Sequence, residues 1–474
     1  MNNPKKNYIY NIIYQILILI IPLIISPYLS RVVGAEGIGI FSYTYSIVYY
    51  FMLLTLLGVN NYGNRSIAKV RDNKKNLSKA FWSIYSFQLL MGILMLLSYL
   101  IYLFFFNVQY KQLFLIETIY IVSAMLDINW FFYGLEEFKK TITRNTILKV
   151  GTLLLVIIFV KKPTDLWKYA LIMSLMTLLS QLVLWNFTRG KVDFVRVSFS
   201  DIAKHIKPNL VLFIPVIAVS IYKMMDKVML GAMTNIKEVG FYENAEKIVN
   251  IPLTIISALG TVMLPRITNM VSNGKNEEVK KYINKSIEFV MFLSFAMCFG
   301  LITIGYDFAP LFFGKEFQKT GILIILLSVT LPFISFANVI RTQYLIPFEK
   351  DKLYTKSVIY GAIINLIMNA IFIPKYDSIG ACFGTIAAEV FVMLYQLISI
   401  KREYNFSKVI KNILPFLLTS IIMIECIYPI KYFISNKIIV LALQVIVGVI
   451  IYGLFNLKYI DQLINLKRIL KIKH

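Results

Sequence analysis

Long runs of apolar residues recur from one end of the chain to the other, separated by short polar connections. A helix needs about 20 predominantly apolar residues to cross a hydrocarbon core of roughly 30 Å. Helices that satisfy their own backbone hydrogen bonds are the simplest structures that such runs can form inside a bilayer. The pattern therefore predicts fourteen transmembrane helices, over residues 9–30, 38–60, 80–106, 112–133, 143–160, 167–187, 209–230, 239–264, 286–306, 321–341, 355–374, 379–400, 411–430 and 437–456.

The composition agrees with this pattern. Of the 474 residues, 58% are apolar and only 16% are charged, and the mean hydropathy is +0.70. A soluble globular protein is less apolar and more highly charged. No connection between the predicted helices is long enough for a separate soluble domain, so the predicted fold class is an all-α polytopic membrane protein.

The net charge of +24 would suggest nucleic-acid binding in a soluble protein, so the distribution of the charges decides their meaning. Most lysines and arginines fall in or beside connections that are cytoplasmic if the N-terminus is cytoplasmic, as the positive-inside rule describes. We therefore expect both termini in the cytoplasm and no nucleic-acid partner. The connection after the second predicted helix is the most basic, with Arg65, Lys69, Arg71, Lys74, Lys75 and Lys79.

A weak internal repeat relates the two parts of the chain at an offset of about 200 residues. Gly34-Ala35 and the following segment 38–41 resemble Gly231-Ala232 and the segment 239–242, and Arg65 falls opposite Arg266. Parallel repeats of this kind build transporters whose substrate site lies between the halves. The repeat predicts an N-terminal lobe over residues 1–207, a C-terminal lobe over 208–402, and two appended helices with a basic cytoplasmic tail over 403–474.

Charged residues inside the predicted helices are the candidates for a substrate site. Each costs about 2.5 to 3.5 kcal/mol at the centre of a bilayer, so such residues line polar paths or pair with one another. Lys223, Asp226 and Lys227 share one helix face. A structural ion pair of Lys223 or Lys227 with Asp226 or Glu246, or snorkelling to the interface, is therefore an open alternative. Glu389, nearest to mid-membrane among the other buried charges, fits ion coupling or helix packing equally. The candidate cavity residues are Arg31, Arg65, Lys223, Asp226, Lys227, Glu246, Lys247 and Arg266.

Signatures of enzymes are missing from the sequence. The two histidines, His205 and His474, lie outside the predicted helices, so a histidine base inside the membrane is not available. The chain carries no GxxxxGK[ST], HExxH or DxD motif, which argues against ATP hydrolysis, zinc proteolysis and metal-dependent sugar-nucleotide transfer. We expect no catalytic residue, no metal site and no cofactor.

Three segments resemble the bacterial polysaccharide flippases of the Wzx type. They read PYLSRVVGAEGIGIFSYTYSI (Pro27–Ile47), DINWFFYGLEEFKK (Asp127–Lys140) and VGFYENAEKIVNIPLTIISALGTVMLPRIT (Val239–Thr268). The resemblance implies two six-helix lobes around a central cavity lined by cations, among which Arg31 matches the family position well. It also implies translocation of an undecaprenyl-pyrophosphate-linked oligosaccharide from the inner to the outer leaflet of the bacterial cytoplasmic membrane, for capsule, O-antigen or exopolysaccharide.

The expected partners are therefore the lipid-linked oligosaccharide, membrane lipids, and a polysaccharide polymerase or other assembly proteins. Coupling to a proton gradient, a sodium gradient or the membrane potential is left open. Three alternatives are a cation-coupled multidrug exporter of the same superfamily, a polymerase or membrane glycosyltransferase, and a non-transporting scaffold. The exporter would favour an acidic cavity for cationic drugs, whereas cations predominate among the candidates here.

Overall fold

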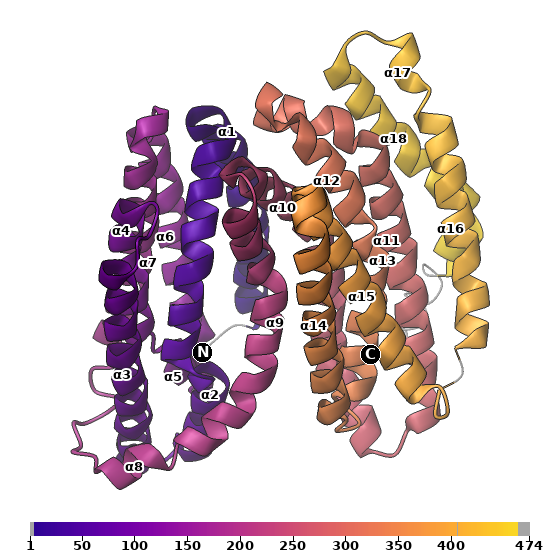
Figure 1. The fold of residues 1–474 in the computed structure, drawn as a ribbon. Coiled ribbons are helices and arrows are strands. Elements are labelled where there is room, and N and C mark those ends of the chain that lie inside the picture. The colour runs from indigo at the N-terminus through magenta and orange to yellow at the C-terminus, as the bar shows by residue number, and fades with distance from the viewer. Residues whose placement is uncertain (1–3, 405, 463–474) are drawn as a thin grey trace. The chain divides into compact units, whose positions relative to one another are not determined.

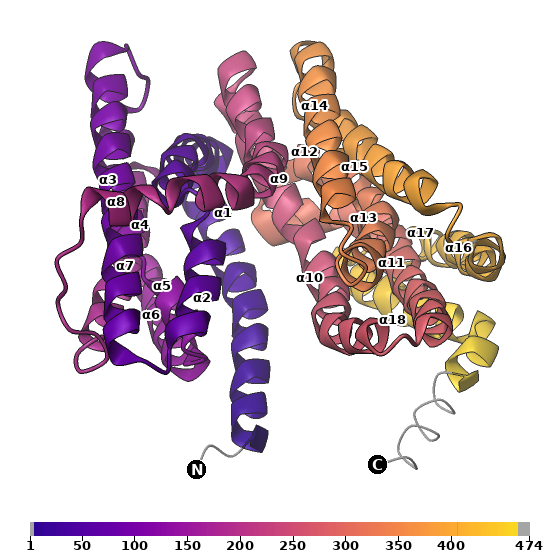
Figure 2. The same cartoon turned by 90° about the horizontal axis from the view of Figure 1, so that it is seen from below.

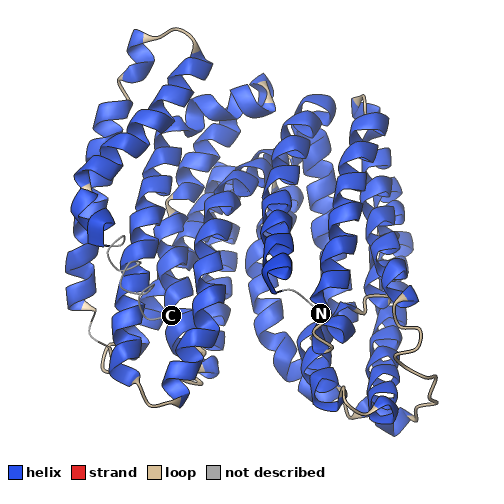
Figure 3. Cartoon of the chain, turned by 180° about the vertical axis from the view of Figure 1, so that it is seen from behind, coloured by secondary structure: helices blue, strands red, loops and turns tan. Residues whose placement is uncertain are grey.

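In the computed structural model, which describes residues 4–404 and 406–462, the chain is built from helices joined by short loops (Figure 1). No strand occurs among these residues (Figure 3). Thirteen helical segments are long and apolar enough to cross a membrane. The first of them crosses twice, because α1 (Pro4–Leu56) is broken at Gly34, where φ is 69°, a backbone conformation that glycine adopts without steric cost. The predicted all-α polytopic fold with fourteen crossings is confirmed.

The helices form two compact units, Met1–Glu243 and Asn244–His474. The first unit holds α1, α2 (Val59–Val70), α3 (Lys74–Phe105), α4 (Lys111–Met125), α5 (Asn129–Gly134), α6 (Phe138–Phe159), α7 (Leu166–Asn186), α8 (Phe199–Ala203), α9 (Ile206–Met233) and the beginning of α10 (Ile236–Ser272). The boundary between the units falls within α10. The predicted lobes at 1–207, 208–402 and 403–474 were instead inferred from the sequence repeat. Those lobe boundaries remain predictions.

A buried polar corner joins α4 to α6 in the first unit. The amide of Gln88 donates to the backbone oxygens of Ala124 (2.7 Å) and Asp127 (2.8 Å), and its oxygen accepts from the indole of Trp130 (3.0 Å). The guanidinium of Arg144 donates to the side-chain oxygen of Asn129 at 3.0 Å. Hydrogen bonds inside the protein replace those that lipid cannot offer. The segment Asp127–Lys140, which carried part of the family resemblance, therefore has a structural role here.

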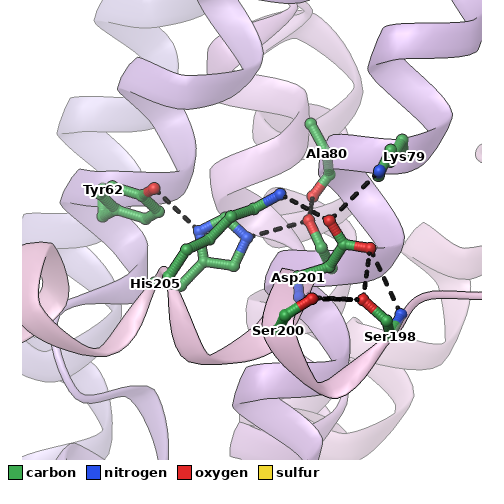
Figure 4. A network of polar contacts seen from close by, with 9 residues as sticks. Tyr62, Lys79, Ala80, Ser198, Ser200, Asp201 and His205 are labelled. Carbon is green, nitrogen blue, oxygen red and sulfur yellow. Dashed lines mark hydrogen bonds and ion pairs between the residues drawn. The ribbon is translucent and has the colours of Figure 1, made fainter.

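A second polar network fixes the start of α9 against α2 and α3 (Figure 4). The imidazole of His205 contacts the Tyr62 hydroxyl at 2.8 Å and the Ser83 hydroxyl at 2.9 Å, and the residue is 5% exposed. Beside it, Asp201 of α8 pairs with Lys79 of α3 at 3.2 Å, and the view from below shows α8 crossing α3 (Figure 2). Both ring nitrogens have partners, so this histidine holds three helices together.

The second unit contains a closely packed pair of helices, α14 and α15. It holds the rest of α10, then α11 (Asn276–Phe313), α12 (Gln318–Ser328), α13 (Thr330–Ile340), a π-helical turn (Arg341–Leu345), α14 (Asp351–Tyr376), α15 (Ser378–Ile400), α16 (Ser407–Ile427), α17 (Ile430–Phe433) and α18 (Lys437–Phe455). A Cβ atom on Gly380 would lie 2.3 Å from the Phe372 oxygen, and one on Gly384 would lie 2.0 Å from the Asn369 side chain. Small residues permit this close helix packing.

The loop after α15 carries an ion pair outside the membrane-spanning segments. Lys350 pairs with Glu403, which also accepts a hydrogen bond of 2.6 Å from the Tyr344 hydroxyl. The hydrogen bond from Lys350, followed by that from Tyr344, lowers the pKa of Glu403. The predicted basic tail lies mostly in residues 463–474, outside the described residues.

Candidate functional site

The second half of α1 and the beginning of α10 cross at two glycines. A Cβ atom on Gly39 would lie 2.0 Å from the backbone oxygen of Ile236, and one on Gly240 would lie 2.1 Å from the backbone oxygen of Ala35. Cβ atoms essentially never approach other heavy atoms within 3.0 Å. Only glycine therefore allows the two helices to come this close at either position.

The two glycine contacts are equivalent by an internal symmetry. Gly240 follows Gly39 by 201 positions, and Ile236 follows Ala35 by the same 201 positions. Gly39 contacts Ile236, and their counterparts, Gly240 and Ala35, contact each other in the same way. Such reciprocal contacts are typical of a twofold axis. The crossing therefore supports the predicted repeat with a local offset of 201. We call Ala35, Gly39, Ile236 and Gly240 the glycine crossing.

One turn further along both helices, a charged cluster lies beside the same axis. The Lys227 ammonium pairs with Oε2 of Glu243 at 2.6 Å, and the Ser42 hydroxyl donates to the same oxygen at 2.9 Å. The Tyr242 hydroxyl donates to Oδ2 of Asp226 at 2.7 Å. Asp226 and Lys227 are 2% and 7% exposed. For Lys227, this geometry supports the structural ion pair that the sequence left open, with Glu243 as a partner.

The other candidate residues are distributed over both units. In the first unit, Arg31 on α1, Arg65 on α2 and Lys223 on α9 are exposed. Asp226 and Lys227 are thus the two candidates that the structure brings into one buried cluster, while Lys223 lies one turn before them on α9. Neither Arg31 nor Lys223 is sealed inside the unit, as a role in substrate binding requires.

In the second unit, Glu246 and Lys247 are half-buried on α10. Arg266 is exposed on the same helix; its guanidinium donates to the Tyr282 hydroxyl at 2.6 Å and lies 4.6 Å from the centre of that ring. Glu389, which the sequence left between ion coupling and packing, is buried on α15. The contact with Tyr282 gives Arg266 a structural partner on α11.

The sequence reasoning missed two acidic residues of the first unit. Neither Glu243 on α10 nor Glu117 on α4 was among the candidate cavity residues. Glu117 is fully buried, and its carboxylate accepts a hydrogen bond of 2.9 Å from the Thr44 hydroxyl. The available signal was that Glu117 is the one acidic residue in the apolar run 112–125.

Neutralising Lys227 should destabilise the protein, whereas neutralising Lys223 should not. The substitution Lys227→Met leaves Glu243 without its ammonium, and removing one partner of a buried ion pair costs about 3 to 5 kcal/mol. Because Glu243 is 17% exposed at its side chain, we expect the lower end of that range. The check is the thermal unfolding midpoint of the purified protein in detergent, with Lys223→Met as the matched control.

The double variant Lys227→Met/Glu243→Gln should regain most of that stability because no uncompensated charge remains. Equal midpoints for Lys227→Met and Lys223→Met would contradict a structural ion pair.

Two family models and several individual proteins match more than half of this chain. The family described as polysaccharide biosynthesis protein matches residues 5–271, more than half of the chain, and the family described as lipid II flippase MurJ matches residues 145–448. A candidate O-antigen transporter of Shigella dysenteriae is 22% identical over 84% of this chain and 100% of its own length. Its counterpart in Escherichia coli strain K12 is 23% identical over 84% of this chain and 97% of its own.

Solved structures share the fold. A structure of the lipid II flippase MurJ in an inward closed conformation superposes with a TM-score of 0.78 at 19% identity, covering 96% of this chain and 99% of that one. An inward-facing multidrug transporter of the MATE family gives a TM-score of 0.62 at 13% identity, covering 84% of this chain and 96% of the other. At these identities the likeness concerns the fold alone.

Proposed function

Since the chain belongs to the polysaccharide biosynthesis protein family, we propose that this multi-pass membrane protein is a Wzx-type flippase that carries lipid-linked oligosaccharides across the membrane. One matching family is described as polysaccharide biosynthesis protein and the other as lipid II flippase, and both relatives are described as O-antigen transporters. The protein is accordingly a transporter and not an enzyme.

The observation that carries the finer proposal is the pair of exposed cations, Arg31 and Lys223, on the membrane-crossing helices α1 and α9. Charged side chains at membrane depth rarely face lipid. A pyrophosphate has concentrated negative charge, and arginine can bind its oxygens through two parallel charge-assisted hydrogen bonds. We propose that these two cations meet the pyrophosphate of an undecaprenyl-linked oligosaccharide in a cavity surrounded by the first, second, seventh and eighth crossings.

The direction of transport is the one that the family resemblance implies. A substrate made on the cytoplasmic side of the bacterial membrane would be delivered to the outer leaflet, by a protein with both termini in the cytoplasm. The apolar tail can stay in the bilayer while the sugar and pyrophosphate pass through the protein. A polymerase and other assembly proteins would then receive the oligosaccharide for O-antigen, capsule or exopolysaccharide.

A multidrug resistance transporter of the MATE family has the same fold, so export of cationic drugs is the alternative function. It would place acidic groups where a cationic drug binds, whereas the exposed candidates in the first unit, Arg31, Arg65 and Lys223, are all cationic. The charge of these residues favours an anionic substrate.

The test is complementation of a bacterial strain that lacks its own O-antigen flippase. The full-length protein should restore surface polymer, detected on the cell surface with a polymer-specific antibody, when it is produced together with its cognate glycan enzymes. Restoration of resistance to cationic dyes without any surface polymer would instead favour an exporter.

A further inference from the structure

Glu117 lies in the interior of the first unit and forms no ion pair among the described residues that would explain its burial. The residue is fully buried, among the aromatic and aliphatic side chains that join α1, α3 and α4. Its one hydrogen bond within the described residues is with Thr44, and its second oxygen, Oε2, has no hydrogen-bond partner. An ionised carboxylate in such a place would lose its solvation without compensation.

The contacts of Thr44 suit both charge states of this carboxyl group. The hydroxyl oxygen lies 2.9 Å from Oε1 of Glu117, 3.0 Å from the Ile40 oxygen and 3.2 Å from the Phe41 oxygen. A hydroxyl has one hydrogen to donate and two lone pairs to accept with. It can donate to an ionised Glu117, or it can donate to the helix backbone while it accepts the hydrogen of a neutral Glu117.

The titratable groups that face Glu117 are tyrosines. Tyr45 comes from α1, Tyr99 from α3 and Tyr120 from α4 itself, and each interacts electrostatically with Glu117. Tyr169 of α7 interacts with Tyr120 in the same way. No lysine or arginine among the described residues forms an ion pair with Glu117. A sodium ion would need several oxygen ligands, as hard cations generally do, and Thr44 supplies one; a proton needs only a carboxylate oxygen.

The same helix connects this carboxyl group to the charged cluster. Thr44 lies two positions after Ser42, which donates to Glu243, and residues two positions apart point to different sides of a helix. The ring of Tyr45, the next residue, lies 5.1 Å from that of Tyr120 on α4. Through its contact with Thr44, a change of charge on Glu117 therefore acts on the segment of α1 that also forms the glycine crossing.

We propose that Glu117 is a proton-binding site through which a proton gradient drives transport. One proton adds to a carboxylate oxygen of Glu117 on the acidic side of the membrane and leaves on the other, with no other bond made or broken. The proposal rests on the transport function proposed above, but its chemistry can be measured without the substrate.

The first measurement is infrared difference spectroscopy of the full-length protein in liposomes between alkaline and acidic pH. The wild type should gain the carbonyl band of a protonated carboxyl group. The variant Glu117→Gln keeps the shape of the neutral acid, so it should fold and lose the part of that band that Glu117 contributes. The matched control is Glu389→Gln, which removes a buried carboxyl group of the second unit and should keep the band. An unchanged band in Glu117→Gln would overturn the proposal.

The second measurement is flipping of lipid-linked oligosaccharide in the same liposomes with and without an imposed pH gradient. The gradient should accelerate the wild type, and Glu117→Gln should flip at its gradient-free rate under both conditions. Acceleration of the wild type by sodium alone would overturn the proton in favour of a metal cation. If the wild type flips nothing, the transport function fails while the infrared result still decides the proton site.

If Glu117→Gln does not elute as a single species, Thr44→Val takes its place. Removing the hydroxyl that contacts the carboxyl group should change the pH at which the infrared transition occurs, and no movement would overturn the proposal.

Discussion

Replacing Gly39 with alanine should abolish transport and lower the stability of the protein. The new Cβ atom would lie 2.0 Å from the Ile236 oxygen, so the two helices of the glycine crossing would have to separate by about 1 Å. Overpacking of a close contact costs about 1 to 3 kcal/mol, and a rigid backbone oxygen leaves no side chain to move aside. Gly240→Ala should have the same effect because it is the symmetry-related contact. Surface polymer and the unfolding midpoint are the two measurements.

The matched control is Gly453→Ala in α18, where a new Cβ atom meets nothing within 4 Å. Alanine favours a helix over glycine by up to about 1 kcal/mol, so this variant should be as stable as the wild type or more so. Wild-type polymer yield and stability in both Gly39→Ala and Gly240→Ala would show that the helices do not approach as closely as described.

Replacing Arg31 with glutamine should reduce transport by about tenfold or more at an unchanged protein level. A hydrogen bond to a charged group contributes about 1.5 to 3 kcal/mol, and glutamine keeps polarity while it loses the charge. Arg31→Lys should retain partial function, since it keeps the charge but not the planar arrangement of donors. The measurement is surface polymer in a flippase-deficient strain, with membrane levels compared by immunoblotting.

Because Arg31 is exposed, its replacement should leave the unfolding midpoint unchanged, in contrast to Lys227→Met. Full polymer yield from Arg31→Gln would assign Arg31 to the membrane interface. The pyrophosphate site would then have to be sought at Lys223 and Lys247.

The helices were predictable because the solvent is lipid: a run of apolar residues long enough to cross a bilayer has few alternatives to a helix. The repeat was also visible, through Gly39 and Gly240, although the sequence could not reveal that these glycines touch each other. The positions at which the helices begin and end were less predictable. Helix α10 runs on to Ser272 and α11 already begins at Asn276, beyond the predicted limits, because polar helical turns extend past the apolar windows.

Partners of charged residues could not be read from helical spacing. Lys227 was expected to pair with Asp226 or Glu246, but its partner in the structure is Glu243, across the turn between α9 and α10. Glu117 was overlooked because a single acidic residue barely changes the hydropathy of its run, and only the structure reveals that it is fully buried beside Thr44.

The most direct test of the account is flipping by the purified full-length protein in liposomes. Pyrophosphate-linked oligosaccharide lipid is placed in both leaflets, and a reagent that cannot cross the bilayer modifies the sugars exposed outside. The wild type should make the protected inner pool accessible, while Gly39→Ala and protein-free liposomes should leave it protected. A wild-type protein that leaves the sugar lipid protected, yet carries a cationic dye across the same membrane, would contradict the assignment as a flippase.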